Sequence, residues 1–150
     1  MKKSVSGMLA IFALLASVSS VPLFGEAKEK SLYDRLGKKK AIAAVVDEFV
    51  ARVAGDDRIN KYFAAAASDP ARLKQFKMNL VDQICMASGG PCVYKGKDMK
   101  AAHMGMGVSS ADFSALVEDL GRALDTLKVA QHEKDQLLGA LATLKSEIVG

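Results

Sequence analysis

The residue in this sequence best suited to chemistry is a histidine set among methionines. His103 follows Met99 by four residues and precedes Met106 by three, at the start of a glycine-rich corner. A neutral imidazole can bind a metal through either ring nitrogen. A lone histidine is more often an ordinary surface or core residue, so the spacing alone leaves both interpretations open.

Other chemistries lack the residues that they need. The second histidine, His132, forms no H-E-x-x-H zinc pattern, and no C-x-x-C-H run is present for covalent haem attachment. Cys85 and Cys92 have no neighbouring histidine that could activate a thiolate. No glycine-rich loop is followed by the Lys-Ser/Thr pair of a phosphate site. The sequence therefore gives no basis for a hydrolase or a transferase.

The composition indicates one domain without a nucleic-acid partner. The 150 residues contain 21 Lys and Arg against 17 Asp and Glu, which is a net charge of +4. This length is typical of a single domain. The positive charges form no stripe with interleaved aromatic residues, so we do not expect nucleic-acid binding.

Apolar residues recur at helical spacing along most of the chain. Residues 42, 45, 46, 49, 50 and 53 form one stripe and predict a helix over residues 40–54. Similar stripes predict helices from residue 70 to the glycine pair at 89–90, from 98 to the glycines at 105 and 107, from about 110 to 127 and from about 132 to 149. No strand alternation occurs, so we expect an all-α fold. Such a fold can enclose a flat apolar cofactor, and His103 could then supply the one axial bond that a b-type haem needs.

The N-terminal segment has the pattern of a secretory signal peptide. Two lysines precede an uncharged run from residue 4 to residue 25, and its most apolar part spans residues 8–18. We expect residues 1–27 to be removed and residues 28–150 to form the domain, in the periplasm of a bacterium or secreted from it. The alternative is an uncleaved membrane anchor, against which six Ser and Pro residues count. No later segment could span a membrane, so we expect no membrane contact after cleavage.

A specific run of residues surrounds His103. It reads Gly89-Gly90, then Tyr94-x-Gly96-x-x-Met99-x-x-Ala102-His103, then Gly105-x-Gly107-Val108 with Phe113. Upstream lie Leu32-Tyr33-Asp34-Arg35-Leu36-Gly37, Val45-Val46-Asp47-Glu48-Phe49 and Tyr62-Phe63. In this order, over residues 31 to about 149, the sequence resembles the truncated haemoglobins of group I.

The resemblance implies a truncated globin fold, a two-on-two helical sandwich around a non-covalent haem b. His103 would be the proximal ligand of the iron, with its other ring nitrogen donating to a backbone carbonyl near Met99. Phe63 would pack on the haem face, and Tyr94 and Lys97 would approach the propionates. The full set of expected haem-binding residues is Phe63, Phe76, Leu80, Tyr94, Lys97, Met99, His103, Val108 and Phe113.

The sequence departs from the family pattern on the distal side. Val50 follows Phe49 where family members commonly carry a tyrosine, so the expected hydroxyl donor to a gas ligand is missing. Phe76, Asn79, Leu80 and Gln83 share one helix face that would look toward the iron. The amides of Asn79 and Gln83 could donate to a ligand there or turn to solvent. Lys38 replaces the second glycine of the family's L-G-G start, where we expect it to affect only a helix cap.

Two further features leave alternatives open. Met99, Met104 and Met106 could offer a sulfur sixth ligand, but flexible packing is the favoured interpretation. Cys85 and Cys92 flank the turn at residues 89–91. An oxidising compartment would allow them to form a disulfide if the turn is tight, and otherwise they are two buried thiols.

The predicted function is an exported haem protein that binds dioxygen or another diatomic gas, such as NO or CO. An enzyme is the alternative, either a nitric oxide dioxygenase served by a reductase or other electron donor, or a peroxidase-type detoxifying protein. A haemless helical interaction protein of the periplasm is the third hypothesis.

Overall fold

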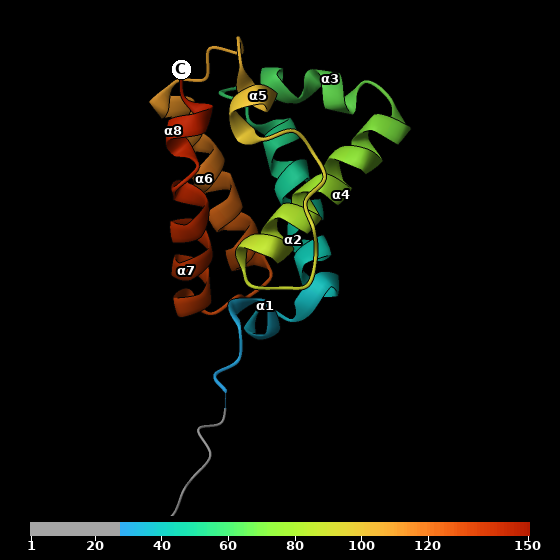
Figure 1. The fold of residues 1–150 in the computed structure, drawn as a ribbon. Coiled ribbons are helices and arrows are strands. Elements are labelled where there is room, and N and C mark those ends of the chain that lie inside the picture. The colour runs from blue at the N-terminus through green and yellow to red at the C-terminus, as the bar shows by residue number, and fades with distance from the viewer. Residues whose placement is uncertain (1–27) are drawn as a thin grey trace, which may run out of the picture.

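The structure, a computed structural model, describes residues 28–150, and the expected signal peptide of residues 1–27 lies outside the described residues. The described part of the chain folds into helices without a strand (Figure 1), which confirms the all-α prediction. Among these helices, none is both long and apolar enough to cross a membrane. The elements are α1 (Leu32–Arg35), α2 (Lys38–Gly55), the 3₁₀ helix η1 (Asn60–Phe63), α3 (Ala64–Ala67), α4 (Pro70–Ala87), α5 (Met99–His103), α6 (Ser110–Thr126), α7 (Gln131–Ala142) and α8 (Lys145–Ile148).

Two pairs of long helices make up most of the fold. Helix α2 packs against α4 on one side and against α6 on another, and α6 in turn packs against α7. In Figure 1, α6 and α7 run side by side while α2 and α4 cross at an angle. The short helix α5 contacts α8, so the segment that carries His103 leans on the C-terminal end of the chain.

The buried residues follow the stripes that the sequence shows. In α2 the buried side chains are those of Ile42, Val45, Val46, Phe49 and Val53. They belong to a main cluster that also contains buried residues of α4, α6 and α7, including Ile84, Leu124 and Leu137. Burial of each such side chain contributes about 1.5–3 kcal/mol, so this cluster holds the two helix pairs together.

A second, smaller cluster lies under α5, and we call it the C-terminal cluster. Its buried members are Val108, Phe113 and Ile148, and the half-buried Met99 and Met106 pack against them. The core of the described chain is therefore divided, with one part formed mainly by the long helices and the other beside His103.

Helix boundaries coincide with capping residues that the sequence already displays. Asp69 accepts hydrogen bonds from the backbone N–H groups of Ala71 and Arg72, directly before Pro70. Ser109 and Asp112 form a reciprocal capping box at the start of α6. These local contacts fix the starts of α4 and α6.

The C-terminal helix differs from the prediction of one helix over about 132–149. The structure divides it into α7 and α8, with the break at Thr143 and Leu144. Leu144 N–H donates to the carbonyl three residues earlier, on Leu141, and the Thr143 hydroxyl donates to the Ala140 carbonyl. These bonds tighten and end the helix. The separate α8 places Ile148 in the C-terminal cluster.

Lys38 occupies a backbone conformation that favours glycine. Its φ is +64°, directly after Gly37 at +92°. A left-handed conformation costs a residue with a Cβ atom about 1 kcal/mol or more. Lys38→Gly should therefore raise the free energy of unfolding by about 0.5–1 kcal/mol, after the greater entropy of glycine in the unfolded chain is subtracted. Urea unfolding measures this gain, and Lys38→Ala, which keeps the Cβ atom, should show none.

A buried carboxyl group lies near the junction of α2 and α6. Asp119 is 4% exposed, and its Oδ2 atom has no hydrogen-bond partner among the described residues. Burial and the neighbouring Asp56 carboxylate raise the pKa of Asp119 above 3.8. Asp56 itself is held at a pKa of about 2 by its hydrogen bonds from Arg58. The two carboxyl groups therefore differ in how readily they ionise.

Asp119 should make the protein less stable as the pH rises. Its raised pKa means that the folded state holds the proton more tightly than the unfolded chain, so stability falls as the pH rises from 3.8 through that pKa. Asp119→Asn should raise the free energy of unfolding at pH 7 by about 1–3 kcal/mol and change it little below pH 3.8. Unfolding curves across this pH range test the prediction. An equal gain from Asp135→Asn, on the exposed side of α7, would contradict it.

Candidate functional site

His103 is fixed by its own helix. It is half-buried at the end of α5, and its Nδ1 atom lies 2.7 Å from the carbonyl oxygen of Met99. A carbonyl only accepts, so this distance assigns the ring proton to Nδ1. Asp98 begins α5 by accepting a hydrogen bond from Ala101 N–H. The Nε2 atom, without a hydrogen-bond partner in residues 28–150, keeps its lone pair for a metal.

The C-terminal cluster lies beside this histidine. Val108 and Phe113, both expected from the sequence to contact the cofactor, are buried there, and Met99 is half-buried against them. Gly105 and Gly107, at φ values of +77° and +61°, turn the chain between α5 and these residues. The structure thus brings four of the predicted site residues, His103 included, to one region.

Four other predicted residues line a separate small cavity. Phe49 and Val50 of α2, Phe63 of η1 and Phe76 of α4 surround a space of about 140 Å³. The rings of Phe63 and Phe76 meet edge to face with their centroids 5.6 Å apart. The half-buried Leu80 follows Phe76 by one helical turn. Asn60 is the one polar side chain in the lining that the structure describes.

The two amides proposed as distal donors both have protein partners. The Asn79 side-chain oxygen accepts a hydrogen bond of 2.9 Å from Gln75. The Gln83 amide donates to the sulfur of Met99 at 3.3 Å, so it points at the residue whose carbonyl holds His103. The Gln75–Asn79 contact follows from i,i+4 spacing on one helix, whereas the Gln83–Met99 contact joins two helices and does not follow from spacing.

Tyr94 and Lys97, the residues expected near the propionates, are joined within one loop. The half-buried Tyr94 hydroxyl donates to the backbone carbonyl of Lys97 at 2.8 Å, while the Lys97 side chain is exposed. Burial and the nearby Asp98 raise the pKa of Tyr94. A Cβ atom at Gly96 would collide with the Tyr94 hydroxyl, so a larger residue there would displace the Tyr94 ring.

Tyr62 is a residue whose role the sequence did not indicate. Its ring packs against both the main cluster and the C-terminal cluster. Its hydroxyl donates to the Asp112 carboxylate at 2.8 Å, and this bond raises the pKa of Tyr62. Tyr62 therefore ties η1 to the start of α6. The only local signal was its place beside Phe63.

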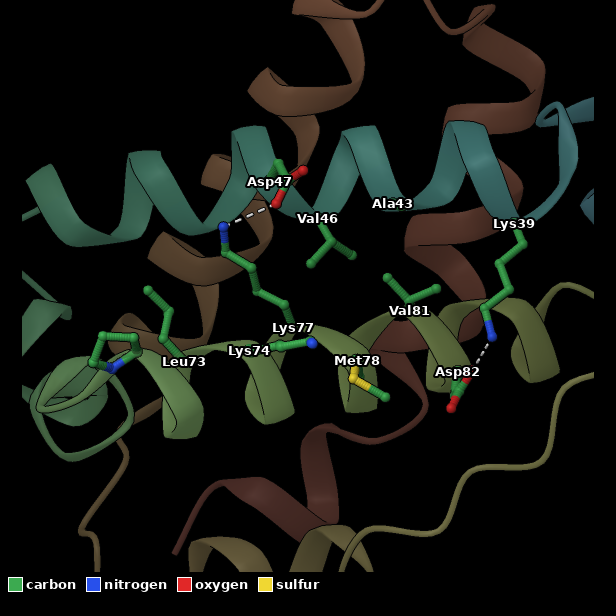
Figure 2. Close-up of a pocket in the computed structure, with 11 residues that line it drawn as sticks. Lys39, Ala43, Val46, Asp47, Leu73, Lys74, Lys77, Met78, Val81 and Asp82 are labelled. Carbon is green, nitrogen blue, oxygen red and sulfur yellow. Dashed lines mark hydrogen bonds and ion pairs between the residues drawn. The ribbon is translucent and has the colours of Figure 1, made fainter.

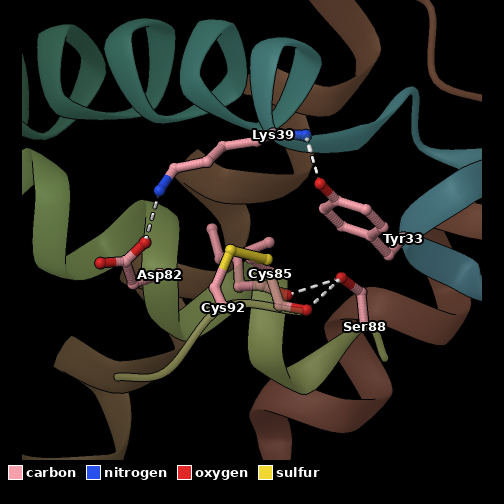
Figure 3. The surroundings of a disulfide bond; sticks show 7 residues. Tyr33, Lys39, Asp82, Cys85, Ser88 and Cys92 are labelled. Atoms are coloured by element: carbon pink, nitrogen blue, oxygen red, sulfur yellow. Dashed lines mark hydrogen bonds and ion pairs between the residues drawn. A yellow bond between two sulfur atoms is a disulfide. The ribbon is translucent and has the colours of Figure 1, made fainter. Parts of the chain in front are cut away.

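Cys85 and Cys92 form a disulfide across the turn at residues 89–91, with their Cα atoms 5.7 Å apart (Figure 3). Cys85 is fully buried in α4, whereas Cys92 is half-buried. Gly90 lies so close to the bond that a Cβ atom there would be 2.7 Å from the Cys85 sulfur. The disulfide fixes where the chain leaves α4 on its way to α5.

A larger groove runs between α2 and α4 (Figure 2). Its volume is about 510 Å³, and Val46, Leu73 and Val81 contribute to its apolar lining. Ion pairs of 2.9 Å, Lys39–Asp82 and Lys77–Asp47, join the two helices along it. None of the residues predicted for the cofactor lines this groove, so its size does not identify it as the site.

The residues around His103 fit a haem. One imidazole with a free Nε2 atom is the donor set that a b-type haem uses. Phe63 and Leu80 from the main cluster, and Met99 and Met106 from the C-terminal cluster, are only partly covered by protein. A flat apolar group would cover such surfaces and gain stability from their burial.

Comparison with known proteins gives the family. The bacterial-like globin family matches residues 31–149. The group 1 truncated haemoglobin GlbN of Mycolicibacterium paratuberculosis is 33% identical over 125 residues, which cover 83% of this chain and 88% of the relative. A group 1 truncated haemoglobin of Tetrahymena thermophila is 34% identical over 115 residues, which cover 77% and 88% of the two chains.

Solved structures agree with these matches. The truncated haemoglobin of Tetrahymena pyriformis in its Fe(III) form gives a TM-score of 0.73 at 28% identity, covering 81% of this chain and 99% of that chain. The 2/2 haemoglobin of a Synechococcus species, in the cyanomet state with covalently attached haem, gives 0.72 at 27%, covering 80% and 98%. The two-on-two globin fold and the haem b cofactor predicted from the sequence are confirmed at the level of the family. The chain belongs to the truncated haemoglobin family and is similar to its group 1 members.

Proposed function

We propose that this chain is an exported haem protein that binds a diatomic gas, with His103 as its proximal ligand. The hydrogen bond from His103 Nδ1 to the Met99 carbonyl carries the assignment, because it fixes the tautomer and leaves Nε2 free to bind iron. The family supports gas binding at haem in general. Our proposal goes further than the family in two respects: it names His103 as the ligand of the iron, and it names a diatomic gas as what binds.

The chain's own residues would act on two sides of a bound haem, the side of His103 and the side where a gas binds. Haem b, when bound, supplies an iron with one coordination position for a gas. Met99 orients the histidine ring on one side. Phe63 and Phe76 present apolar rings that exclude water, and Val50 and Leu80 offer a gas no hydrogen-bond donor.

This apolar lining favours gas binding over peroxidase-type chemistry. Peroxidase-type turnover requires an acid–base group beside the substrate. The residues that line the 140 Å³ cavity include no titratable side chain. Nitric oxide dioxygenation would need no such group but would need a reductase or another electron donor, so it is the second candidate.

Export is part of the proposal. The charged start and apolar run at residues 2–25 support it, as does the Cys85–Cys92 disulfide, since disulfides persist in oxidising compartments. Mass spectrometry of the periplasmic fraction should show a chain that starts near Lys28 and lacks two hydrogens. Intact Met1 in the membrane fraction, or two free thiols, would contradict this part.

Optical spectra of the purified protein test the function. We expect one haem per chain, a sharp Soret band, and shifts of that band when the reduced protein meets carbon monoxide or dioxygen. Failure to bind haem stoichiometrically would favour a haemless helical interaction protein. Continuous nitric oxide consumption with a reductase would favour the enzyme.

A further inference from the structure

The segment between α4 and α5 is attached to the rest of the protein at few points. We call residues 91–98 the strap. From residue 91 to residue 97 it makes no backbone–backbone hydrogen bond with the described part of the chain. Its one side-chain hydrogen bond there, from Tyr94 to the Lys97 carbonyl, is internal to the strap. Contacts at its two ends therefore decide where it lies and where α5 begins.

Helix α4 supplies a contact at each end of the strap. The disulfide joins Cys85 to Cys92 near the beginning. At the other end, the Gln83 amide donates to the sulfur of Met99, the first residue of α5, at 3.3 Å. Residues 83 and 85 point about 200° apart around a helix. The strap thus passes from one face of α4 to another and is held at both.

Met99 connects the Gln83 contact to the histidine. Its side chain accepts from Gln83, and its backbone carbonyl accepts from Nδ1 of His103 at 2.7 Å. Helix α5 has only five residues, so a shift of Met99 moves the ring with little of the helix to resist it. Both Gln83 and Met99 are half-buried, which limits competition from water for this contact.

We propose that Gln83 is a positioning residue for His103, acting through Met99, and not a hydrogen-bond donor to the gas. The inference rests on the proposed function, because it requires His103 to bind iron. A well-placed partner on the second ring nitrogen orients a ligating histidine and raises its basicity. Gln83 keeps that partner, the Met99 carbonyl, in place.

Resonance Raman spectra of the reduced, ligand-free holoprotein test the proposal through the iron–histidine stretching band. Gln83→Leu should broaden this band, move it to lower wavenumber, and speed haem transfer to an apo-globin acceptor by up to about tenfold. Met99→Leu removes the sulfur acceptor and should have the same effect. The double variant, Gln83→Leu with Met99→Leu, should show no larger shift than either single variant. Asn79→Leu is the matched control: it makes the same kind of change one turn earlier, where the amide contacts Gln75, and should leave the band unchanged.

Two results would overturn the proposal. One is an unchanged band in Gln83→Leu whose far-ultraviolet circular dichroism shows a native fold. The other is an equal shift in Asn79→Leu. Failure of the proposed function is distinct, because the wild-type protein would then show no iron–histidine band.

Discussion

His103→Ala should abolish stable haem retention. In the proposed function the ring would supply the one bond from protein to iron, because its Nδ1 is held by the Met99 carbonyl and Nε2 is left to bind, and the apolar contacts alone would not replace that bond. Purified under identical conditions, the variant should contain little haem and show no sharp Soret band. Added imidazole, which can occupy the space left by the ring, should restore part of the absorbance.

His132→Ala is the matched control for this experiment. His132 is exposed at the start of α7 and lies outside the site. Its replacement should leave the haem content and the spectrum unchanged. A wild-type spectrum and haem affinity in His103→Ala would refute the proximal assignment.

Val50→Tyr should slow the release of dioxygen by about tenfold to over a hundredfold. Dioxygen becomes partly negative when it binds iron, so a directed hydroxyl donor stabilises it by roughly 1.5–3 kcal/mol. That free energy corresponds to a dissociation rate about tenfold to over a hundredfold slower. Val50 cannot donate, and it lines a cavity of about 140 Å³ that can receive part of a larger ring. We therefore expect rapid release from the wild-type protein, measured by stopped flow.

Two comparisons distinguish the effect of the tyrosine hydroxyl on dioxygen release from the effect of the size of its ring. Val50→Phe occupies the same space without a donor and should not slow release as Val50→Tyr does. Carbon monoxide is less polar when bound and should respond much less to the hydroxyl. If the wild-type protein releases dioxygen slowly and Val50→Tyr does not change the dissociation rate, position 50 does not face the gas.

The helices could be predicted because their signals are local. The stripe of α2, the Asp69–Pro70 start of α4 and the Ser109 cap of α6 all act within a few residues. The break between α7 and α8 was not predicted, because the apolar stripe continues through it and the contact that α8 makes, of Ile148 with Val108 and Phe113, joins residues far apart in the sequence. A continuous apolar stripe carries no sign of it.

The same distinction applies to the candidate site. Met99 and His103 are four residues apart on one helix, so their hydrogen bond is nearly implied by helical geometry. The partners of Gln83 and Tyr62 lie 16 and 50 residues away and depend on how separate elements meet. Residue type alone indicated that Gln83 could donate, but not to which acceptor.

The divided core has a thermodynamic consequence. In the described chain, Tyr62 is a side chain that packs against both clusters, and a cofactor held by residues of each would add a further link. Any ligand that binds only the folded state adds to its stability by mass action, about 4.1 kcal/mol at a thousand times its dissociation constant. Without haem, the C-terminal cluster and α5 should open first, since few contacts hold them. The supply of haem would then set how much of the protein survives proteolysis.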